Sequence, residues 1–407
     1  MSAYTTANVS PSAIDAARQR VAAQLKIELV TPSHVEDNEK KRKEVSRSFL
    51  SDTITVPTKE MYEYAVNSTL GDDVYHEPST LALEAHVARI TGKEAALFMS
   101  SGTQSNQIGL RTHLRQPPYS VLCDFRSHVY RHEAGGISFH SSAAVTPVQP
   151  TNGHHITLED VKANLIENDG DLHAAPTAVV SLENTLDGGI FPQSEIIAIS
   201  EYAHSHNVAM HLDGARIWHV AAETGTSLRE LCDPFDTVSL CLSKGLGAPV
   251  GSVLVGPKEF IRKARHFRKL FGGAMRQTGL ISASAAYALT HNFAQLPRVH
   301  ALARRLQAGL EYAGVDILKP AETCMVFFEP KSIGSTVAEI SRRAAELPEP
   351  LGVYSGRLVV HLQTTEAAVD DLVRLVHKIA TEKRAEGFVK PSKQVKGATA
   401  FKYTSKL

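Results

Sequence analysis

The sequence predicts an α/β protein with a mostly parallel sheet in a large domain and a smaller α+β domain after it. From Phe49 onward, short apolar runs alternate with amphipathic helical patterns, which is typical of a parallel sheet covered by helices. After about Leu280 a long helical stretch leads to shorter strands and helices. We expect an N-terminal extension at 1–48, a large domain at 49–280, a linker helix with a small domain at 281–388, and a tail at 389–407.

Each element follows from its own pattern. Apolar runs bounded by turn residues predict the strands AALFMS, SVLCDF, TAVVSLE, VAMHLD, TVSLCLS and SVLVG, followed in the small domain by CMVFFEP and GRLVVHL. Helical spacing predicts helices at 12–27, 80–91, 104–114, 193–206, 215–225, 337–346 and 366–383. The charge cluster EDNEKKRKE is interpreted as part of a solvated N-terminal arm.

Composition favours a small-molecule partner. Lys+Arg and Asp+Glu both total 43, so no excess charge attracts nucleic acid or an anionic membrane. No apolar run approaches the roughly 20 residues of a membrane span, and the N-terminus lacks the pattern of a secretory signal. The four cysteines show no metal-ligand spacing and are predicted to be reduced core residues. We therefore expect a soluble intracellular protein.

The last three residues, Ser405-Lys406-Leu407, match the peroxisomal address S-K-L. The preceding segment is basic and polar, as an accessible address requires. The predicted compartment is the peroxisome, with the cytoplasm as the alternative.

Three groups near strand ends could carry chemistry. Lys244 lies in a glycine-rich turn directly after one strand, and Asp213 ends another. Gly102 and Thr103 lie where a strand gives way to a helix, so free N–H groups could bind a phosphate. Each group also has a non-catalytic interpretation: Lys244 as a surface lysine, Asp213 as an ion-pair carboxylate, and Gly102 with Thr103 as the start of a capped helix. Together they match what pyridoxal phosphate requires, namely a lysine for a Schiff base, an acid at the ring nitrogen and donors for the phosphate.

Seven ordered motifs strengthen this hypothesis: LSDTITVPTKEM, GDDVYHEPSTLALE, GKEAALFMSSGTQSNQ, SLENT, HLDGARIW, CLSKGLGAPVGSVLVG and FGGAMRQTG. They resemble the motifs of the low-specificity L-threonine aldolase family, which are pyridoxal-phosphate enzymes of fold type I. The likeness covers about 49–383. It implies an amino-acid substrate and a homodimer or homotetramer with shared active sites.

The resemblance also implies roles for individual residues. Lys244 matches the Schiff-base lysine, Asp213 the partner of the pyridine nitrogen, and His128 the residue that stacks on the cofactor. Further cofactor contacts are implied for Gly102, Thr103, Arg216, Ser243 and Arg276, the last across a subunit boundary. Ser51, Arg216 and Arg357 match the clamp for the substrate carboxylate, Tyr75 lies in a loop expected to border the substrate, and His173 matches a second active-site imidazole.

The implied reaction is retro-aldol cleavage of threonine, allo-threonine or another β-hydroxy amino acid to glycine and an aldehyde, with His128 or a water it holds as base. Three departures lie near the substrate: Leu50 replaces an arginine, the GDDVYHEPST loop is one residue short, and His132 replaces an apolar residue. These changes keep open an alanine racemase, because fungal alanine racemases also resemble this family. A non-catalytic binding protein with the same fold is the second alternative.

Overall fold

The computed structural model describes residues 11–27, 29 and 32–390 of the 407-residue chain. The chain divides into two units between Glu44 and Val45. The first contains α1 (Pro11–Leu25) and most of α2 (Pro32–Ser46). The helix predicted at 12–27 is therefore confirmed. The charge cluster is also helical, with pairs three residues apart such as Lys41 and Glu44 at 3.5 Å, and its side chains are exposed.

The second unit is built on a seven-stranded sheet in the order β1-β7-β6-β5-β4-β2-β3. Strand β7 runs antiparallel to both neighbours, and all other pairs are parallel. The strands are β1 (Ala95–Met99), β2 (Ser120–Asp124), β3 (Ala144–Val148), β4 (Thr177–Glu183), β5 (Ala209–Asp213), β6 (Thr237–Cys241) and β7 (Ser252–Gly256). The six strands predicted for the large domain are confirmed.

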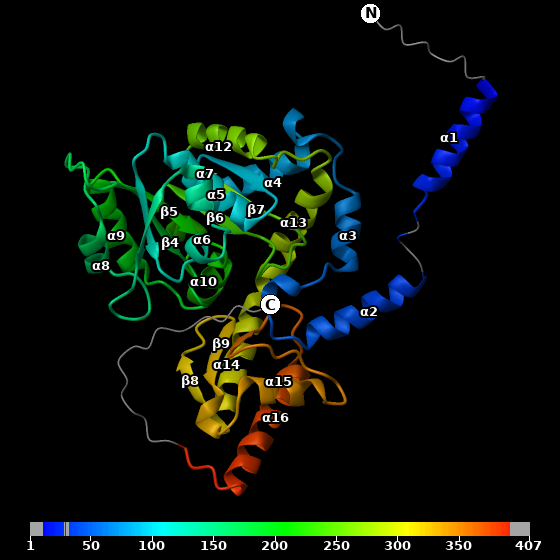
Figure 1. The fold of residues 1–407 in the computed structure, drawn as a ribbon, viewed down its shortest axis with the longest axis vertical. Helices are drawn as coiled ribbons and strands as arrows, with labels where there is room; N and C mark the ends of the chain where they lie inside the picture. Colours follow the sequence, from blue (N-terminus) through cyan, green and yellow to red (C-terminus); the bar gives the residue numbers. More distant parts are fainter. Residues whose placement is uncertain (1–10, 28, 30–31, 391–407) are drawn as a thin grey trace, which may run out of the picture. The chain divides into compact units, whose positions relative to one another are not determined.

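Successive side chains along these strands point to opposite faces of the sheet, and each face packs against its own set of helices (Figure 1). On β1, Phe98 belongs to the larger core, whereas Leu97 and Met99 belong to a core on the other side. The first face packs α4 (Pro78–Thr91), α8 (Leu158–Asn164), α9 (Gln193–Ser205), α10 (Ile217–Thr224), α11 (Leu228–Cys232) and α13 (Gly279–Asn292). The second packs α5 (Gly102–His113), α6 (His128–Arg131), α7 (Gly136–Ser141) and α12 (Lys258–Leu270).

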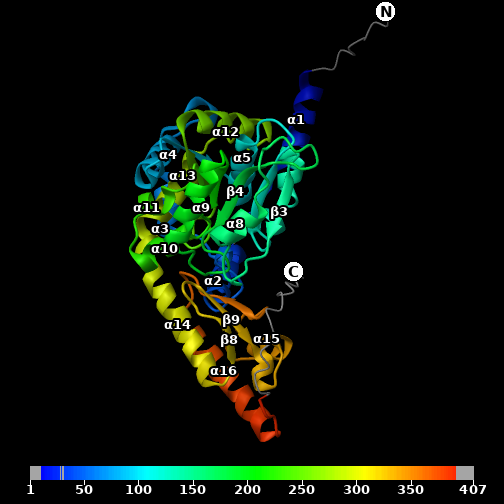
Figure 2. The same cartoon turned by 90° about the vertical axis from the view of Figure 1, so that its left-hand side faces the viewer.

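A second, antiparallel sheet forms the smaller α+β part, in the order β10-β9-β8. Its strands are β8 (Asp316–Lys319), β9 (Met325–Glu329) and β10 (Arg357–Val359). The helices α14 (Leu296–Tyr312), α15 (Val337–Ala345) and α16 (Glu366–Ala385) contribute to its separate apolar core. Helix α14 contacts both α10 and β9 and so connects the two sheets (Figure 2). The predicted α/β class with a smaller α+β part is confirmed.

The arrangement positions a site at one edge of the large sheet. Parallel strands β2, β4, β5 and β6 all end there, and ligands of such sheets bind beyond these carboxyl ends. Among the described residues, no helix combines the length and the apolar character needed to cross a bilayer. Ser405 to Leu407 lie outside the described residues, so the peroxisomal address stays a prediction.

Candidate active site

A cavity of about 470 Å³ lies at the carboxyl ends of the parallel strands. The segments after β2, β4, β5 and β6 each contribute to its wall, and the small sheet closes another side. Five residues that the sequence singled out line it: Ser51, His128, Arg216, Lys244 and Arg357. The topology therefore brings together groups that are up to 306 positions apart in the chain.

Lys244 is held in a tight turn directly after β6. Its carbonyl accepts a hydrogen bond from Gly247 N at 2.8 Å, and Gly247 has φ +73°, which favours glycine. The Lys244 side chain is half-buried and lines the cavity. The glycines of SKGLG thus shape the turn that presents this amine.

Asp213 ends β5 within a buried network that fixes both of its oxygens. Oδ1 accepts from Ala215 N at 3.0 Å, and Oδ2 accepts from Asn106 Nδ2 at 2.8 Å. The Asn106 amide also donates to Glu133, and Oδ1 of Asn106 lies 3.3 Å from His211 Nε2. A carboxylate oriented in this way suits a cationic ring nitrogen.

His128 begins the short helix α6 after β2, and its ring is oriented by Glu133. Nδ1 of His128 lies 2.8 Å from Oε1 of Glu133, whose side chain is fully buried and also accepts from Asn106 and Gln107. With Nδ1 donating to this carboxylate, Nε2 of His128 is left as the acceptor. The ring nitrogen, the Glu133 oxygen and an Asp213 oxygen all lie within 4.8 Å of one another.

Glu183 ends β4 and is a carboxyl group that sequence reasoning did not single out. Burial, reinforced by the nearby charge of Asp213, raises the pKa of Glu183 well above its usual range. Its Oε2 accepts from the backbone N of His128 at 2.8 Å. Glu183 therefore contributes to the cavity wall a carboxyl group whose uncharged form is favoured by burial. The sequence signal for it was its place in SLENT at a strand end.

Arg216 is paired with a second residue that the sequence did not single out, Asp52. Nε and Nη2 of Arg216 donate to the two Asp52 oxygens at 2.8 and 2.6 Å. Burial opposes the charge on Asp52, but the guanidinium outweighs it and holds the pKa of Asp52 well below its usual range. Arg357 is close by, since its Nη2 lies 3.5 Å from the carbonyl oxygen of Leu50. A guanidinium fixed in this way can present its remaining donors to an anion.

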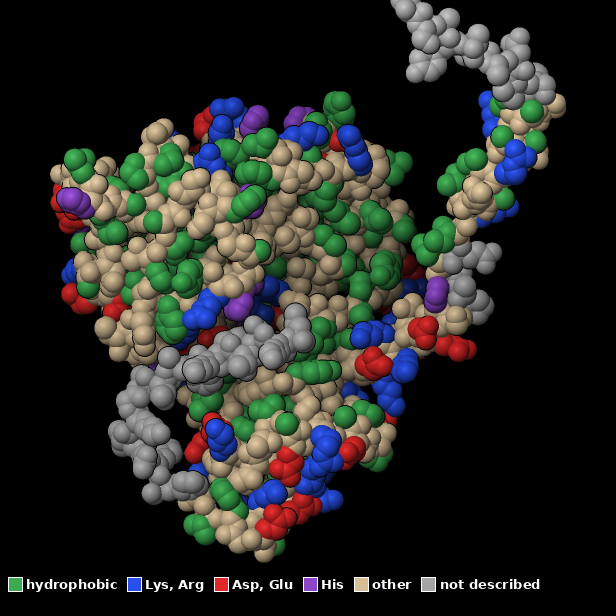
Figure 3. Space-filling model, viewed as in Figure 1, with side chains coloured by type: hydrophobic (Ala, Val, Ile, Leu, Met, Phe, Trp, Pro, Cys, Tyr) green, Lys and Arg blue, Asp and Glu red, His purple; other side chains and the backbone are tan. Residues whose placement is uncertain are grey.

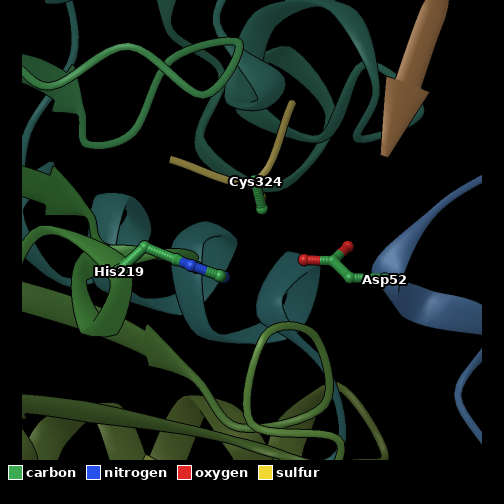
Figure 4. Close-up of side chains that lie close together, drawn as sticks. All are labelled: Asp52, His219 and Cys324. Atoms are coloured by element: carbon green, nitrogen blue, oxygen red, sulfur yellow. The ribbon is translucent and has the colours of Figure 1, made fainter. Parts of the chain in front are cut away.

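Below this pair lies a buried cluster of Asp52, His219 and Cys324, whose side chains point toward a common space (Figure 4). Their ligand atoms all lie within 4.8 Å of one another. Nδ1 of His219 lies 2.8 Å from His300 Nε2, and Nε2 of His219 has no hydrogen-bond partner among the described residues. Burial lowers the pKa of His219 to about 3, so the ring is neutral. Both Asp52 oxygens already accept hydrogen bonds from Arg216. We therefore interpret His219 and Cys324 as buried packing residues next to this ion pair.

The predicted phosphate site lies at the start of α5. Ser101 caps the helix by accepting from Gln104 N at 3.1 Å, so the earlier N–H groups of Gly102 and Thr103 are without acceptors inside the helix. The ideal Cβ position on Gly102 lies 3.6 Å from Ser252 Oγ, a buried hydroxyl with no partner among the described residues. Ser243, another predicted cofactor contact, follows β6, and its Oγ lies 3.4 Å from Cys241 Sγ. These donors fit a phosphate.

Three further predicted site residues are exposed in the single chain and lie outside the cavity lining. His173 lies on an exposed turn, where its backbone N donates to Asp171 at 2.9 Å. Tyr75 is 80% exposed, and the side chain of Arg276 is 77% exposed. Imidazoles beside His128 in the cavity wall come instead from His132 and His154. Local motifs could not reveal which of these side chains the fold turns toward the strand ends.

Comparison with known proteins identifies the family of this chain. The model of the beta-eliminating lyase family matches residues 48–332. A low-specificity L-threonine aldolase of Candida albicans is 47% identical, covering 81% of this chain and 88% of that protein. The chain belongs to the low-specificity L-threonine aldolase family. The alanine racemase TOXG of Cochliobolus carbonum is also related, at 38% identity over 81% of this chain and 87% of that protein.

Solved structures confirm fold type I. Leishmania major threonine aldolase superposes with a TM-score of 0.67 at 21% identity, covering 82% of this chain and 99% of that chain. Serine palmitoyltransferase from S. paucimobilis with bound PLP gives a TM-score of 0.62 at 17% identity, covering 83% of this chain and 87% of that chain. That palmitoyltransferase structure contains pyridoxal phosphate (PLP), the cofactor that the sequence motifs imply for this chain. The oriented Asp213 carboxylate and the orphaned Ser252 hydroxyl beside Gly102 fit its ring and its phosphate.

Proposed function

We propose that this enzyme cleaves L-threonine, L-allo-threonine and related β-hydroxy-α-amino acids to glycine and an aldehyde. The observation that carries the proposal is the convergence of Lys244, His128 and Arg216 in one cavity of a chain that belongs to this family. Bound pyridoxal phosphate supplies an electron sink for the bond that breaks at the substrate Cα. Lys244 holds the cofactor, Asp213 keeps its ring nitrogen protonated, and Gly102, Thr103 and Ser243 bind its phosphate end.

The protein groups select which bond breaks by orienting the substrate. Arg216, Ser51 and Arg357 bind the α-carboxylate, which fixes the rotation about the bond to Cα. His128, with Nδ1 donating to Glu133, accepts the β-hydroxyl proton at Nε2. Loss of this proton drives the Cα–Cβ bond to open, the aldehyde leaves, and Cα receives a proton to give glycine.

Alanine racemisation is the second candidate, and a specific observation favours it. His132 lies beside His128 in the cavity wall, with ring centroids 5.6 Å apart, and a racemase is among the relatives. A second imidazole could exchange the Cα proton on the opposite face. The aldolase ranks first because the aldolase relative is closer in sequence, 47% against 38% identity.

One assay separates the two candidates. The purified holoenzyme is incubated with L-threonine and with L-alanine in separate reactions, and glycine, acetaldehyde and D-alanine are measured. We expect equal amounts of glycine and acetaldehyde from threonine and no D-alanine. D-Alanine without glycine would reverse the order of the two candidates.

We further propose that the active sites are completed across a dimer of this chain. Arg276 donates to Asp72 at 2.6 Å and shares one surface with Tyr75. The neighbouring elements α3 (Lys59–Val66) and α13, which pack against each other, also carry exposed apolar side chains (Figure 3): Tyr62, Tyr64, Val66 and Leu280. Such a patch favours burial against another subunit.

Complementation tests this arrangement. Arg276→Ala and Lys244→Ala homo-oligomers should each be inactive or weak, because each site lacks one required group. Unfolding and refolding the two variants together should restore activity to about a quarter of wild type, since mixed dimers contain one intact site. Co-refolding that yields only the sum of the separate activities would place Arg276 and Lys244 in the same subunit's site. Refolded wild type serves as the control for yield.

A further inference from the structure

Lys319 belongs to the far wall of the cavity, which the reaction described above does not use. It ends β8, and the small sheet contributes Leu318, Lys319, Met325 and Phe327 to the lining. The lining includes Lys244 and His128 but neither Gly102, Thr103 nor Asp213. The cavity of about 470 Å³ therefore takes the reactive end of the cofactor together with the substrate, and it extends from there to the side chains of the small sheet.

Within the described part of the chain, the ammonium group of Lys319 has no hydrogen-bond acceptor. Its side chain is 25% exposed, and its Nζ lies 4.2 Å from the centroid of the Phe327 ring. The nearest carboxylate, Asp187 Oδ2, is 3.9 Å away, beyond hydrogen-bond distance. No hydrogen bond from Nζ is found to any residue that the structure describes. A largely buried cation with three unused donors is costly unless a ligand supplies acceptors.

Charges around Lys319 favour an anionic ligand. Six cationic side chains line the cavity, namely Arg126, Arg131, Arg216, Lys244, Lys319 and Arg357, against the two carboxyl groups of Glu183 and Asp187. The α-carboxylate and the cofactor account for Arg216, Arg357 and Lys244. Burial raises the pKa of Glu183 and so favours its uncharged form. The three further cations, Arg126, Arg131 and Lys319, outnumber the two carboxyl groups in the lining.

Of those three cations, only Lys319 makes no hydrogen bond to a residue that the structure describes. Nε and Nη2 of Arg126 donate to Asp124 at 2.9 and 2.8 Å, and Nη2 also donates to the carbonyl of His154 at 2.8 Å. Arg131 donates to the carbonyl of Phe125 at 2.9 Å. Burial lowers the pKa of Lys319 to about 8, partly offset by Asp187 and reinforced by Arg126. A bound anion would relieve this unfavourable environment.

We propose that Lys319 binds a carboxylate at the end of the substrate side chain, and that the preferred substrates are β-hydroxy-α-amino acids with acidic side chains. This inference rests on the proposed retro-aldol function. For β-hydroxyaspartate, the β-hydroxyl proton passes to His128, the Cα–Cβ bond breaks, glyoxylate leaves, and Cα takes up a proton to form glycine. For β-hydroxyglutamate the aldehyde product carries one more methylene.

Binding and cleavage are measured separately. L-Aspartate and L-glutamate lack the β-hydroxyl, so their binding to the holoenzyme can be titrated through the cofactor absorbance without retro-aldol turnover. We expect at least one acid to bind about tenfold or more tightly than its amide, asparagine or glutamine, the scale of a charged hydrogen bond. Lys319→Met should remove this preference, and Lys319→Arg should retain most of it. The control is Lys331→Met, at an exposed lysine that follows strand β9 of the small sheet, and it should leave the preference unchanged.

The same variants are then assayed with β-hydroxyaspartate, β-hydroxyglutamate and L-threonine. We expect Lys319→Met to lower kcat/KM for the acidic substrates about tenfold or more and to change it for threonine less than about twofold. Equal binding of acids and amides by wild type would overturn the role of Lys319, even if threonine is cleaved. The enzyme could instead bind acids more tightly than amides through Lys319 and yet cleave none of the substrates. That result would support the carboxylate site at Lys319 and contradict the retro-aldol function.

Discussion

Replacing Lys244 with alanine should lower glycine release from L-threonine by about a thousandfold or more, the scale on which removal of an essential catalytic group acts. The same change should abolish the near-visible absorbance of the lysine-bound cofactor. The physical reason is geometric, because the turn after β6 presents this amine to the cavity that His128 and Arg216 also line. Glycine release and the absorbance spectrum are measured on the same preparation after reconstitution with pyridoxal phosphate.

Lys319→Met is the matched control, because Lys319 is the other lysine that lines the cavity among the described residues. It belongs to the small sheet, away from the strand ends that hold the cofactor groups. We expect Lys319→Met to keep the absorbance and the cleavage of threonine. Retention of both by Lys244→Ala would remove the basis of the proposed mechanism.

The large sheet was predictable because its strands are continuous apolar runs buried on both faces. The edge strand β3 was missed, since its sequence AVTPV is only partly buried and contains Pro147, which breaks a strand pattern. Strand β8, the four residues DILK, was missed because it is short and carries charges at both ends. The charge cluster EDNEKKRKE was interpreted as part of a solvated arm, and its side chains are exposed. The sequence reading did not predict that this arm is helical, although opposite charges three residues apart are compatible with the helix α2.

Within the site, the sequence located groups that directly follow strands, such as Lys244 and Asp213, because the carboxyl ends of parallel strands share one edge. It did not find the partners that orient them. Asp52 lies 164 positions from Arg216, and Lys319 reaches the cavity only through the packing of the small sheet. His173 shows the converse, because a match to a motif does not reveal that the side chain lies on an exposed turn.

Replacing Asp52 with asparagine should have the largest effect on stability. The change leaves the buried guanidinium of Arg216 without its counter-charge, and breaking a buried pair in this way costs about 3–5 kcal/mol of unfolding free energy. It should also raise KM for threonine about tenfold or more, since Arg216 would no longer be held for the substrate carboxylate. Denaturant unfolding measures the first effect and steady-state kinetics the second.

The exposed pair of Arg342 and Glu346 provides the control, because its 2.8 Å contact lies between side chains that are 62% and 59% exposed. Glu346→Gln should cost less than about 1 kcal/mol and leave KM unchanged. The folded-state pKa of Asp52 is depressed, so its contribution is fully present above the unfolded pKa of about 4 and is lost as pH falls below it. The stability gap between wild type and Asp52→Asn should therefore stay constant from neutral pH down to about pH 5 and narrow only below about 4. A gap that closes near pH 6 would show that another group, and not the Asp52 carboxylate, holds Arg216.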